Sequence, residues 1–332
     1  MFRIRRSPMT AALAAAAIMA TSACTIGGDA SDATTLTLGH TWAATDANAE
    51  AVQEFADTVY SESEGELRIE VYTGGQLGDD AQVLESLGIE VTDMWVGGSG
   101  VYNQMTAVGQ FLVLPYLFED IDEAMSHYDG DLGRDVEDQI DKDTPTQLLS
   151  LWPRGARHLT MNEEVTSPDD LAGQRIRVPE NPMILRSWEK FGASPTPMPF
   201  GDVLTALQQG VLEGQENPLE TIDSAGLASA QSTLMLTSHV IEPTAVSISD
   251  AAWDKLTEEQ QSVMNEAANG AVRDDLLEYV QTQEDRLPEE LSAQGMNVIE
   301  PENSPFEALA ADLVPQADPV VRDLYDRRWN DE

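Results

Sequence analysis

Strand-like and helix-like segments alternate along most of the chain, and this alternation limits the possible folds more than any other feature. Leu36–Gly39 and Leu67–Tyr72 have strand patterns, and Ala47–Tyr60 between them has apolar residues at helical spacing. A helix over Asp79–Leu87 and a strand at Asp93–Val96 continue the order. Such alternation predicts an α/β protein, in which helices cover the faces of largely parallel sheets.

The second part of the chain repeats this order. A strand is predicted at Gln147–Leu151, and Ser167 followed by Pro168 indicates a short helix start. The stretch GQRIRVPE, which begins at Gly173, predicts the next strand. A helix over Phe200–Gln209 and a strand over Val211–Gln215 follow.

From Thr257 onward the pattern becomes helical over a long span. Thr257 and Gln260 have the spacing of a capping box, and we expect Pro288 to interrupt the helix. The chain has 332 residues, which exceeds the length at which a single core usually keeps growing. Two lobes are therefore expected.

The N-terminus has the features of an export signal. Arginines precede an apolar run over Met9–Ala20, which is too short for a membrane span but fits a secretory signal. We expect residues 1–23 to be a signal peptide and 24–33 a tether, with lipid attached to Cys24, the only cysteine. Thr21 departs from the usual lipoprotein pattern, so conventional cleavage stays open.

The charge of the chain excludes one class of partner. It has 59 acidic and 18 basic residues, a formal net charge of −41. Nucleic-acid binding requires a basic stripe, which this sequence lacks, so no nucleic-acid partner is expected. A single cysteine also excludes an intrachain disulfide or a cysteine-based metal site. No cofactor or metal is predicted.

Arg175 and Arg177 stand two residues apart within the predicted strand after Gly173. Both would project to one face of that strand, while Ile176 and Val178 project to the other. One interpretation is a pair of surface ion pairs, each contributing about 0–1 kcal/mol. The alternative is that one guanidinium faces a cleft and binds a carboxylate with its planar fork.

Four stretches resemble the solute-binding proteins of TRAP transporters, the DctP type. They are GQLGDD at Gly75–Asp80, GARHLTMN around Arg157, GQRIRVPENP, and the long segment Gly192–Leu219. The resemblance implies a two-lobed type II periplasmic-binding-protein (Venus-flytrap) fold with a hinge and a long late helix. It places lobe I at 34–154 plus about 243–282, and lobe II at 155–242 plus about 283–332.

The same resemblance implies a ligand site. Arg177 matches the arginine that pairs with the ligand carboxylate, and Arg157 matches a second cleft arginine, expected here in a loop. Asn217 matches a ligand-contacting amide, and Phe200 matches an aromatic that closes over the ligand. Arg175 keeps the surface interpretation.

Some positions depart from the sialic-acid-binding members. Those members carry a glutamate and an arginine where this chain has Gly98 and Val101, which argues against sialic acid. Glu180 replaces an asparagine and adds an acceptor. Trp95 and His40 are further candidates for the pocket, with buried core the alternative for Trp95. A dicarboxylate or hydroxy acid is the default ligand, and a sugar acid stays open.

An enzyme acting on a carboxylate is a weaker alternative, because the four histidines and Ser99 fit no catalytic motif. An ABC-type or sensor-linked binding lipoprotein would share the fold. The N-terminal pattern predicts a protein that is exported and anchored by Cys24 to the outer face of the cell membrane. The resemblance implies that it is partnered with the TRAP integral membrane subunits. Its expected ligand is a small carboxylate.

Overall fold

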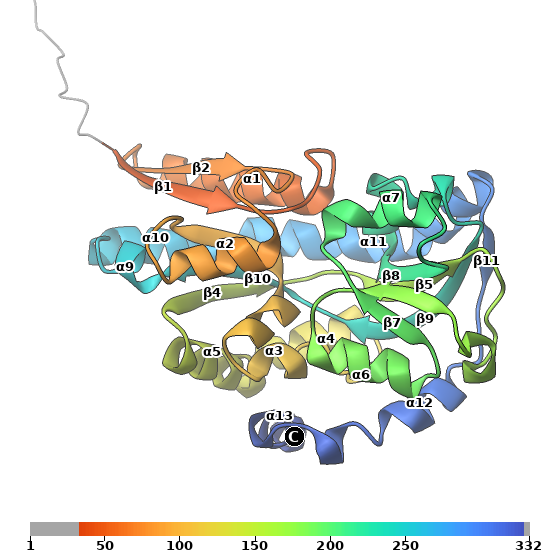
Figure 1. Ribbon diagram of the computed structural model, residues 1–332. Helices are drawn as coiled ribbons and strands as arrows, with labels where there is room; N and C mark the ends of the chain where they lie inside the picture. Colours follow the sequence, from red (N-terminus) through yellow and green to blue (C-terminus); the bar gives the residue numbers. More distant parts are fainter. Residues whose placement is uncertain (1–32, 329–332) are drawn as a thin grey trace, which may run out of the picture. The chain divides into compact units, whose positions relative to one another are not determined.

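The computed structural model describes residues 33–328, and their strands form two mixed sheets (Figure 1). The first sheet has the order β2-β1-β3-β10-β4, and the second has the order β11-β9-β5-β8-β6-β7. The bounds in the first sheet are β1 (Thr34–Gly39), β2 (Leu67–Tyr72), β3 (Met94–Gly98), β4 (Thr146–Trp152) and β10 (Thr244–Ser249). Those in the second are β5 (Ala156–Met161), β6 (Arg175–Val178), β7 (Ser194–Pro197), β8 (Gly214–Pro218), β9 (Thr233–Ile241) and β11 (Asn297–Ile299).

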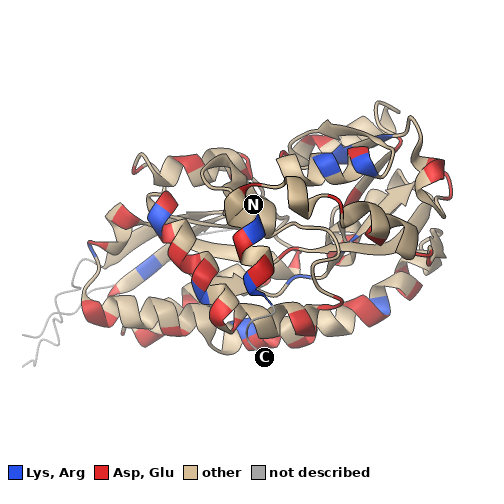
Figure 2. Cartoon of the chain, turned by 90° about the horizontal axis from the view of Figure 1, so that it is seen from below, with Lys and Arg blue, Asp and Glu red and all other residues tan. Residues whose placement is uncertain are grey.

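Helices cover both sheets. They are α1 (Ala47–Glu62), α2 (Asp80–Leu87), α3 (Val108–Phe111), α4 (Ile121–Tyr128), α5 (Asp131–Asp143), α6 (Pro182–Lys190), α7 (Val203–Gln208), α8 (Leu219–Ser224), α9 (Asp250–Trp253), α10 (Glu258–Asn269), α11 (Ala271–Ala293), α12 (Ser304–Ala310) and α13 (Pro319–Arg327). Acidic residues are spread over many of these helices (Figure 2), as expected for a solvated surface.

Two short segments carry the chain between the sheets, and they lie side by side. Residues 153–155 join β4 to β5, and residues 242–243 join β9 to β10. The register fixes their proximity, because Trp152 pairs with Thr244 on one side and Ala156 with Ile241 on the other. Helix α11 also contacts elements of both sheets. The two sheets and these connections give the two-lobed α/β fold that the sequence predicted.

Local sequence signals explain many of the element boundaries. Thr257 and Gln260 form the expected capping box of α10, and Ser167 caps the short 3-10 turn Pro168–Leu171. Asp79 forms a further capping box with Gln82 at the start of α2. These caps satisfy backbone N–H groups that would otherwise lack partners at the helix starts.

The predicted strand at Val211–Gln215 was misplaced, because the strand is β8, Gly214–Pro218. Val211 is exposed, and its N–H bonds to the Ala206 carbonyl at the end of α7. Strand β8 is buried along its whole length although three of its residues are polar, since β5 and β6 flank it. A hydrophobicity pattern does not reveal such a strand.

The expected interruption at Pro288 was also wrong. Helix α11 continues through Pro288, and the chain breaks earlier, at Gly270 between α10 and α11. A proline inside a helix costs roughly 3 kcal/mol. Leu287 and Leu291 are buried on one face of α11 and pack into the second sheet's core, which offsets that cost.

The structure does not test the predicted signal peptide, the lipid attachment at Cys24 or the predicted lobe boundaries. The predicted signal peptide (1–23) and Cys24 lie outside the described residues. The lobe boundaries stay a prediction. Helix α12 packs against α6, while α13 reaches α3 and α5 (Figure 1).

Trp152 provides a test of the first sheet's core. Its side chain is 0% exposed, packs edge-on against Phe55 at 5.8 Å, and donates from Nε1 to the Ala268 carbonyl at 2.7 Å. Trp152→Ala should lower the free energy of unfolding by about 3–5 kcal/mol because it leaves a cavity and an unpaired carbonyl. Urea unfolding measures this loss. The exposed Val211→Ala should change stability by less than about 0.5 kcal/mol, and equal effects of the two variants would contradict the assignment.

Candidate functional site

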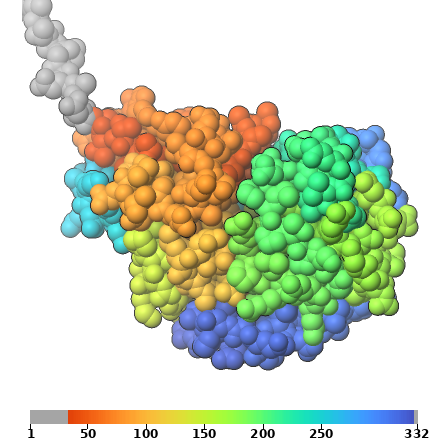
Figure 3. All heavy atoms as spheres, viewed as in Figure 1, coloured from red at the N-terminus to blue at the C-terminus, as the bar shows by residue number. Residues whose placement is uncertain are grey.

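A cavity of about 120 Å³ lies where the two sheets meet beside the connecting segments. Figure 3 shows the outer seam between the orange part of the chain, which includes α2, and the green part, which includes α6 and α7. Both sheets contribute to the lining. The lining residues are Thr41, Trp42, Asp79, Asp80, Ala81, Gly98, Gly100, Val101, Gln104, Arg154, Arg157, Arg177, Pro179, Glu180, Asn181, Ile184, Met198, Pro199, Phe200, Asn217, Thr221 and Glu242.

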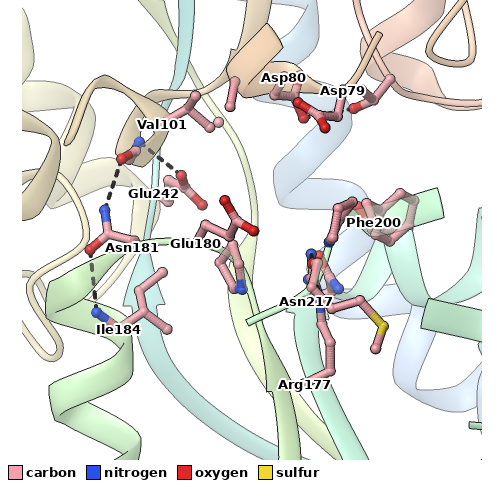
Figure 4. A pocket seen from close by; sticks show the side chains of 18 of the residues that line it. Asp79, Asp80, Val101, Arg177, Glu180, Asn181, Ile184, Phe200, Asn217 and Glu242 are labelled. Carbon is pink, nitrogen blue, oxygen red and sulfur yellow. Dashed lines mark hydrogen bonds between the residues drawn. The ribbon is translucent and has the colours of Figure 1, made fainter. Parts of the chain in front are cut away.

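Arg177 is a buried cation that faces this cavity from β6 (Figure 4). It is 4% exposed, and burial lowers the pKa of its guanidinium to about 10, so it stays charged at neutral pH. Its Nε and Nη2 donate to the Met198 carbonyl at 2.9 and 2.6 Å. Within residues 33–328 it forms no salt bridge, although an isolated buried charge is costly.

Arg175 differs from Arg177 in its exposure, in its charge partner and in its position relative to the cavity. It is exposed, pairs with Glu213 and donates to the Gly210 carbonyl, and it does not line the cavity. The surface interpretation of Arg175 is confirmed. Alternation along β6 would place both side chains on one face, but only the second one reaches the strand's end at the cavity.

Arg157 lies in strand β5, so the expectation that it sits in a loop was wrong. Its Nε and Nη2 contact the two carboxylate oxygens of Glu216 at 2.5 and 2.8 Å, and Nη1 donates to Glu242 at 2.9 Å. Burial raises the pKa of Glu216, but Arg157 and the hydrogen bond from His239 outweigh it and bring the pKa to about 2. The charge of Arg157 is therefore already balanced by protein carboxylates.

The other residues carried over from the resemblance also border the cavity. Asn217 in β8 is buried, and its Nδ2 donates to Gln215 at 2.5 Å. The half-buried ring of Phe200 lies 6.0 Å from the Arg177 guanidinium carbon. Glu180 is exposed at the rim, and its carbonyl accepts from Asn103 at 3.0 Å.

Gly98 lines the cavity at the end of β3. A Cβ on this residue would stand 2.7 Å from Oε1 of Glu242. The Glu242 carboxylate thus occupies the space that a side chain at position 98 would need. Val101 also lines the cavity.

Two predicted site residues do not reach the cavity. Trp95 is fully buried behind it and donates from Nε1 to Asp80 at 3.0 Å, which holds that carboxylate at the cavity wall. His40 is also buried, and burial lowers its pKa to about 4. Its ring lies 5.5 Å from the ring of Trp42, which does line the cavity. His40 and Trp95 therefore support the lining from behind.

Sequence reasoning missed several lining residues, among them Asp80, Asn181, Arg154 and Glu242. Asn181 caps α6 and donates to the carbonyls of Gly100 and Gly109 at 2.8 and 2.9 Å. Glu242 lies between an apolar strand and Pro243, and its burial cannot be read from that pattern because most glutamates at such positions are exposed. Asp80 stood in the recognised GQLGDD stretch without an assigned role.

A cavity between the two sheets of an α/β fold is a typical place for a small molecule to bind, and here its wall contains a buried arginine that has no carboxylate partner within residues 33–328. The sequence comparison agrees, since residues 38–323 match the family of bacterial extracellular solute-binding proteins, family 7. The chain belongs to this family. It is a solute-binding protein of the TRAP type and not an enzyme.

Individual relatives extend over most of the chain. A solute-binding protein of Roseobacter denitrificans is 32% identical over 88% of this chain and 90% of its own length. The sialic acid-binding periplasmic protein SiaP of Vibrio cholerae is 31% identical over 88% of this chain and 92% of its own. The aligned segments cover 88% of this chain and therefore include strands of both sheets.

Two solved structures show the same fold. A TRAP periplasmic solute-binding protein from Roseobacter denitrificans with bound L-galactonate has a TM-score of 0.84, 28% identity, and coverage of 89% of this chain and 98% of its own. A TRAP protein from Polaromonas bound to D-erythronate has a TM-score of 0.84, 26% identity, and coverage of 89% and 98%. None of the helices within 33–328 is long and apolar enough to cross a membrane.

Glu220 joins helix α8 to the start of helix α1, outside the segments that connect the two sheets. From α8, its Oε1 accepts from the Ala47 N–H at 2.8 Å, at the start of α1. Asp46, which caps α1, accepts from Ser224 of α8 at 2.9 Å. Burial, and after it the nearby Asp46, raises the pKa of Glu220 to about 7. Two acidic groups thus share one buried contact between α1 and α8.

This contact predicts a pH dependence of stability. The folded protein keeps the Glu220 proton up to about pH 7, whereas the unfolded chain loses it near pH 4.3. Between these values the folded state binds more protons, so the contribution of Glu220 falls as pH rises. Glu220→Gln should flatten the stability curve over this range in urea unfolding at pH 5, 6, 7 and 8. The exposed Glu54→Gln on α1 serves as the control. Parallel curves for Glu220→Gln and the wild type would refute the assignment.

Proposed function

We propose that the protein captures a small organic acid by its carboxylate and delivers it to the membrane subunits of a TRAP transporter. The observation that carries this proposal is Arg177, a buried guanidinium that faces the cavity and has no carboxylate partner among the described residues. A ligand carboxylate would supply that partner, and the planar fork of arginine matches its two oxygens.

The surroundings of Arg177 favour a ligand that also carries hydroxyl groups. Asp79 and Asp80 line the wall across the cavity from Arg177, and Glu180 lies between them (Figure 4). Carboxylates accept hydrogen bonds from hydroxyls but repel a second ligand carboxylate. The L-galactonate and D-erythronate bound by the two solved relatives carry one carboxylate and several hydroxyls. We therefore propose a sugar acid or related hydroxy acid in preference to a dicarboxylate.

Ligand capture would proceed by closure around the connecting segments 153–155 and 242–243. Hinge-type binding proteins rotate about short connecting segments of this kind. Closure buries the ligand carboxylate against Arg177, which strengthens each charge-assisted hydrogen bond. The contact between the ligand carboxylate and Arg177 would thus contribute both to affinity and to the stability of the closed form.

Replacing Arg177 tests this function. Arg177→Ala should weaken carboxylate binding by roughly 10²-fold or more, because a buried ligand charge would lose its partner. Calorimetric titration and thermal melting with L-galactonate, D-erythronate, pyruvate and succinate measure the effect. The ligand-free variant should melt no lower than the wild type, since an unpaired buried cation is removed.

Arg175→Ala is the matched control, because Arg175 lies on the same strand outside the cavity. It should leave affinity unchanged. Arg177→Lys keeps the charge but loses the two-pronged geometry, so its affinity should be intermediate. If Arg177→Ala bound any of these acids as tightly as the wild type, the proposed role of Arg177 would be wrong.

We propose further that lipid on Cys24 holds the mature protein at the outer face of the cell membrane. The support is the apolar run ending in Thr-Ser-Ala-Cys and the absence of any other cysteine from the sequence. Cells fed a labelled fatty acid should incorporate label into the wild type but not into Cys24→Ser, which should be released to the soluble fraction. Identical membrane fractions for both proteins would exclude this anchor.

A further inference from the structure

Arg154 and Glu242 lie on the two segments that connect the sheets, and both face the cavity. Arg154 is 7% exposed and Glu242 is 5% exposed. Nη1 of Arg154 stands 3.9 Å from Oε2 of Glu242. This distance is within the range of an ion pair but too long for a direct hydrogen bond.

Each partner has unused hydrogen-bonding capacity. Arg154 donates from Nη2 to Thr221 at 3.2 Å, and its Nε has no partner among the described residues. Its guanidinium carbon lies 5.7 Å from the centroid of the Trp42 ring, within the range of a cation–π contact. Buried polar groups without partners are costly, so an additional acceptor near Arg154 would be stabilising.

The carboxylate of Glu242 is also only partly used. Oε1 accepts from the Gly100 N–H at 3.0 Å, which the dashed line at Glu242 marks in Figure 4. Oε2 accepts from Nη1 of Arg157 at 2.9 Å. A carboxylate offers about four lone-pair positions, so about two are left. An acceptor with free lone pairs thus faces a donor with free N–H groups across a short gap.

A hydroxyl group fits this gap because it accepts and donates at once. An oxygen about 2.8 Å from both atoms would bridge the 3.9 Å separation at an angle of about 90°, accepting from Arg154 and donating to Glu242. A second ligand carboxylate has no proton to donate and would repel Glu242. A methylene would leave both groups unsatisfied.

Gly98 leaves room for the Glu242 carboxylate of this pair. A Cβ on Gly98 would lie 2.7 Å from Oε1 of Glu242 and 3.4 Å from Nη1 of Arg154. The backbone there has a φ of −58°, a value that any residue adopts, so the glycine is not required by its conformation. Its role at this position is to let the Glu242 carboxylate lie beside Arg154, a position from which a Cβ would displace it.

We propose that Arg154 and Glu242 act together as a hydroxyl-recognition pair that selects hydroxylated monocarboxylates over their deoxy analogues and over dicarboxylates. This inference rests on the proposed function, in which Arg177 binds the carboxylate of the same ligand. Arg177 then provides affinity for acids in general, and the pair determines which acid binds.

The test removes ligand hydroxyls and protein groups in a double-mutant design. Binding of D-erythronate and L-galactonate is measured by calorimetry, together with the 2-deoxy and 3-deoxy analogues of each and with succinate. In the wild type, loss of one particular hydroxyl should weaken binding by about 10-fold or more, as expected for a hydrogen bond to charged groups. Succinate should bind more weakly than either aldonate.

Three variants should abolish this discrimination. In Glu242→Gln, Arg154→Gln and Gly98→Ala, loss of the same hydroxyl should cost less than about 3-fold. Because each variant is compared with itself on two ligands, a change in its stability cancels. Arg175→Gln, outside the cavity, should retain the wild-type discrimination.

The outcomes separate this inference from the proposed function. A hydroxyl dependence that persists in all three variants, or no dependence on any hydroxyl, overturns the inference while Arg177-dependent binding stands. Succinate binding as tight as that of the aldonates would also overturn the inference about Arg154 and Glu242 and leave Arg177-dependent binding intact. No binding of any acid in the panel overturns both.

Discussion

Three arginines are buried around one cavity, and within residues 33–328 two buried carboxylates, those of Glu216 and Glu242, lie within ion-pair distance of them. Arg157 takes both Glu216 and Glu242, Arg154 shares Glu242 at 3.9 Å, and Arg177 is left with a carbonyl alone. An uncompensated charge in a protein interior is strongly unfavourable. In the proposed function, the carboxylate of the ligand supplies the missing negative charge beside Arg177, at the place where the cavity, the two sheets and the connecting segments meet.

The connecting segments link this electrostatic arrangement to motion. Arg154 and Glu242 lie on the segments themselves, whereas Arg157 and Arg177 lie in strands of the second sheet. In the proposed closure, the surroundings of all four of these groups change together. The hydrogen bond between Glu220 of α8 and the start of α1 is a further contact between the helices that cover the two sheets. An acidic group therefore also contributes to the packing of one sheet's helices against the other's.

Much of the fold could be predicted from the sequence, because the order of helices and strands depends on local residue patterns. The α/β order, the capping box at Thr257 and the surface role of Arg175 followed from periodicity and residue type. Errors arose where tertiary packing overrode a local rule. Pro288 remained helical because leucines on both sides are buried, and β8 was displaced because its polar residues are buried between two other strands.

The sequence by itself determined the family, the α/β order and the candidate status of Arg177. Only the tertiary structure decided which arginine remains available to a ligand. Glu216 and Glu242 lie 59 and 85 positions from Arg157 along the chain, and strand pairing and the crossing segments bring them to it. Electrostatic compensation depends on distance in space, which a linear pattern does not contain, and for that reason the roles of Arg154, Arg157 and Arg177 separate only in the folded protein.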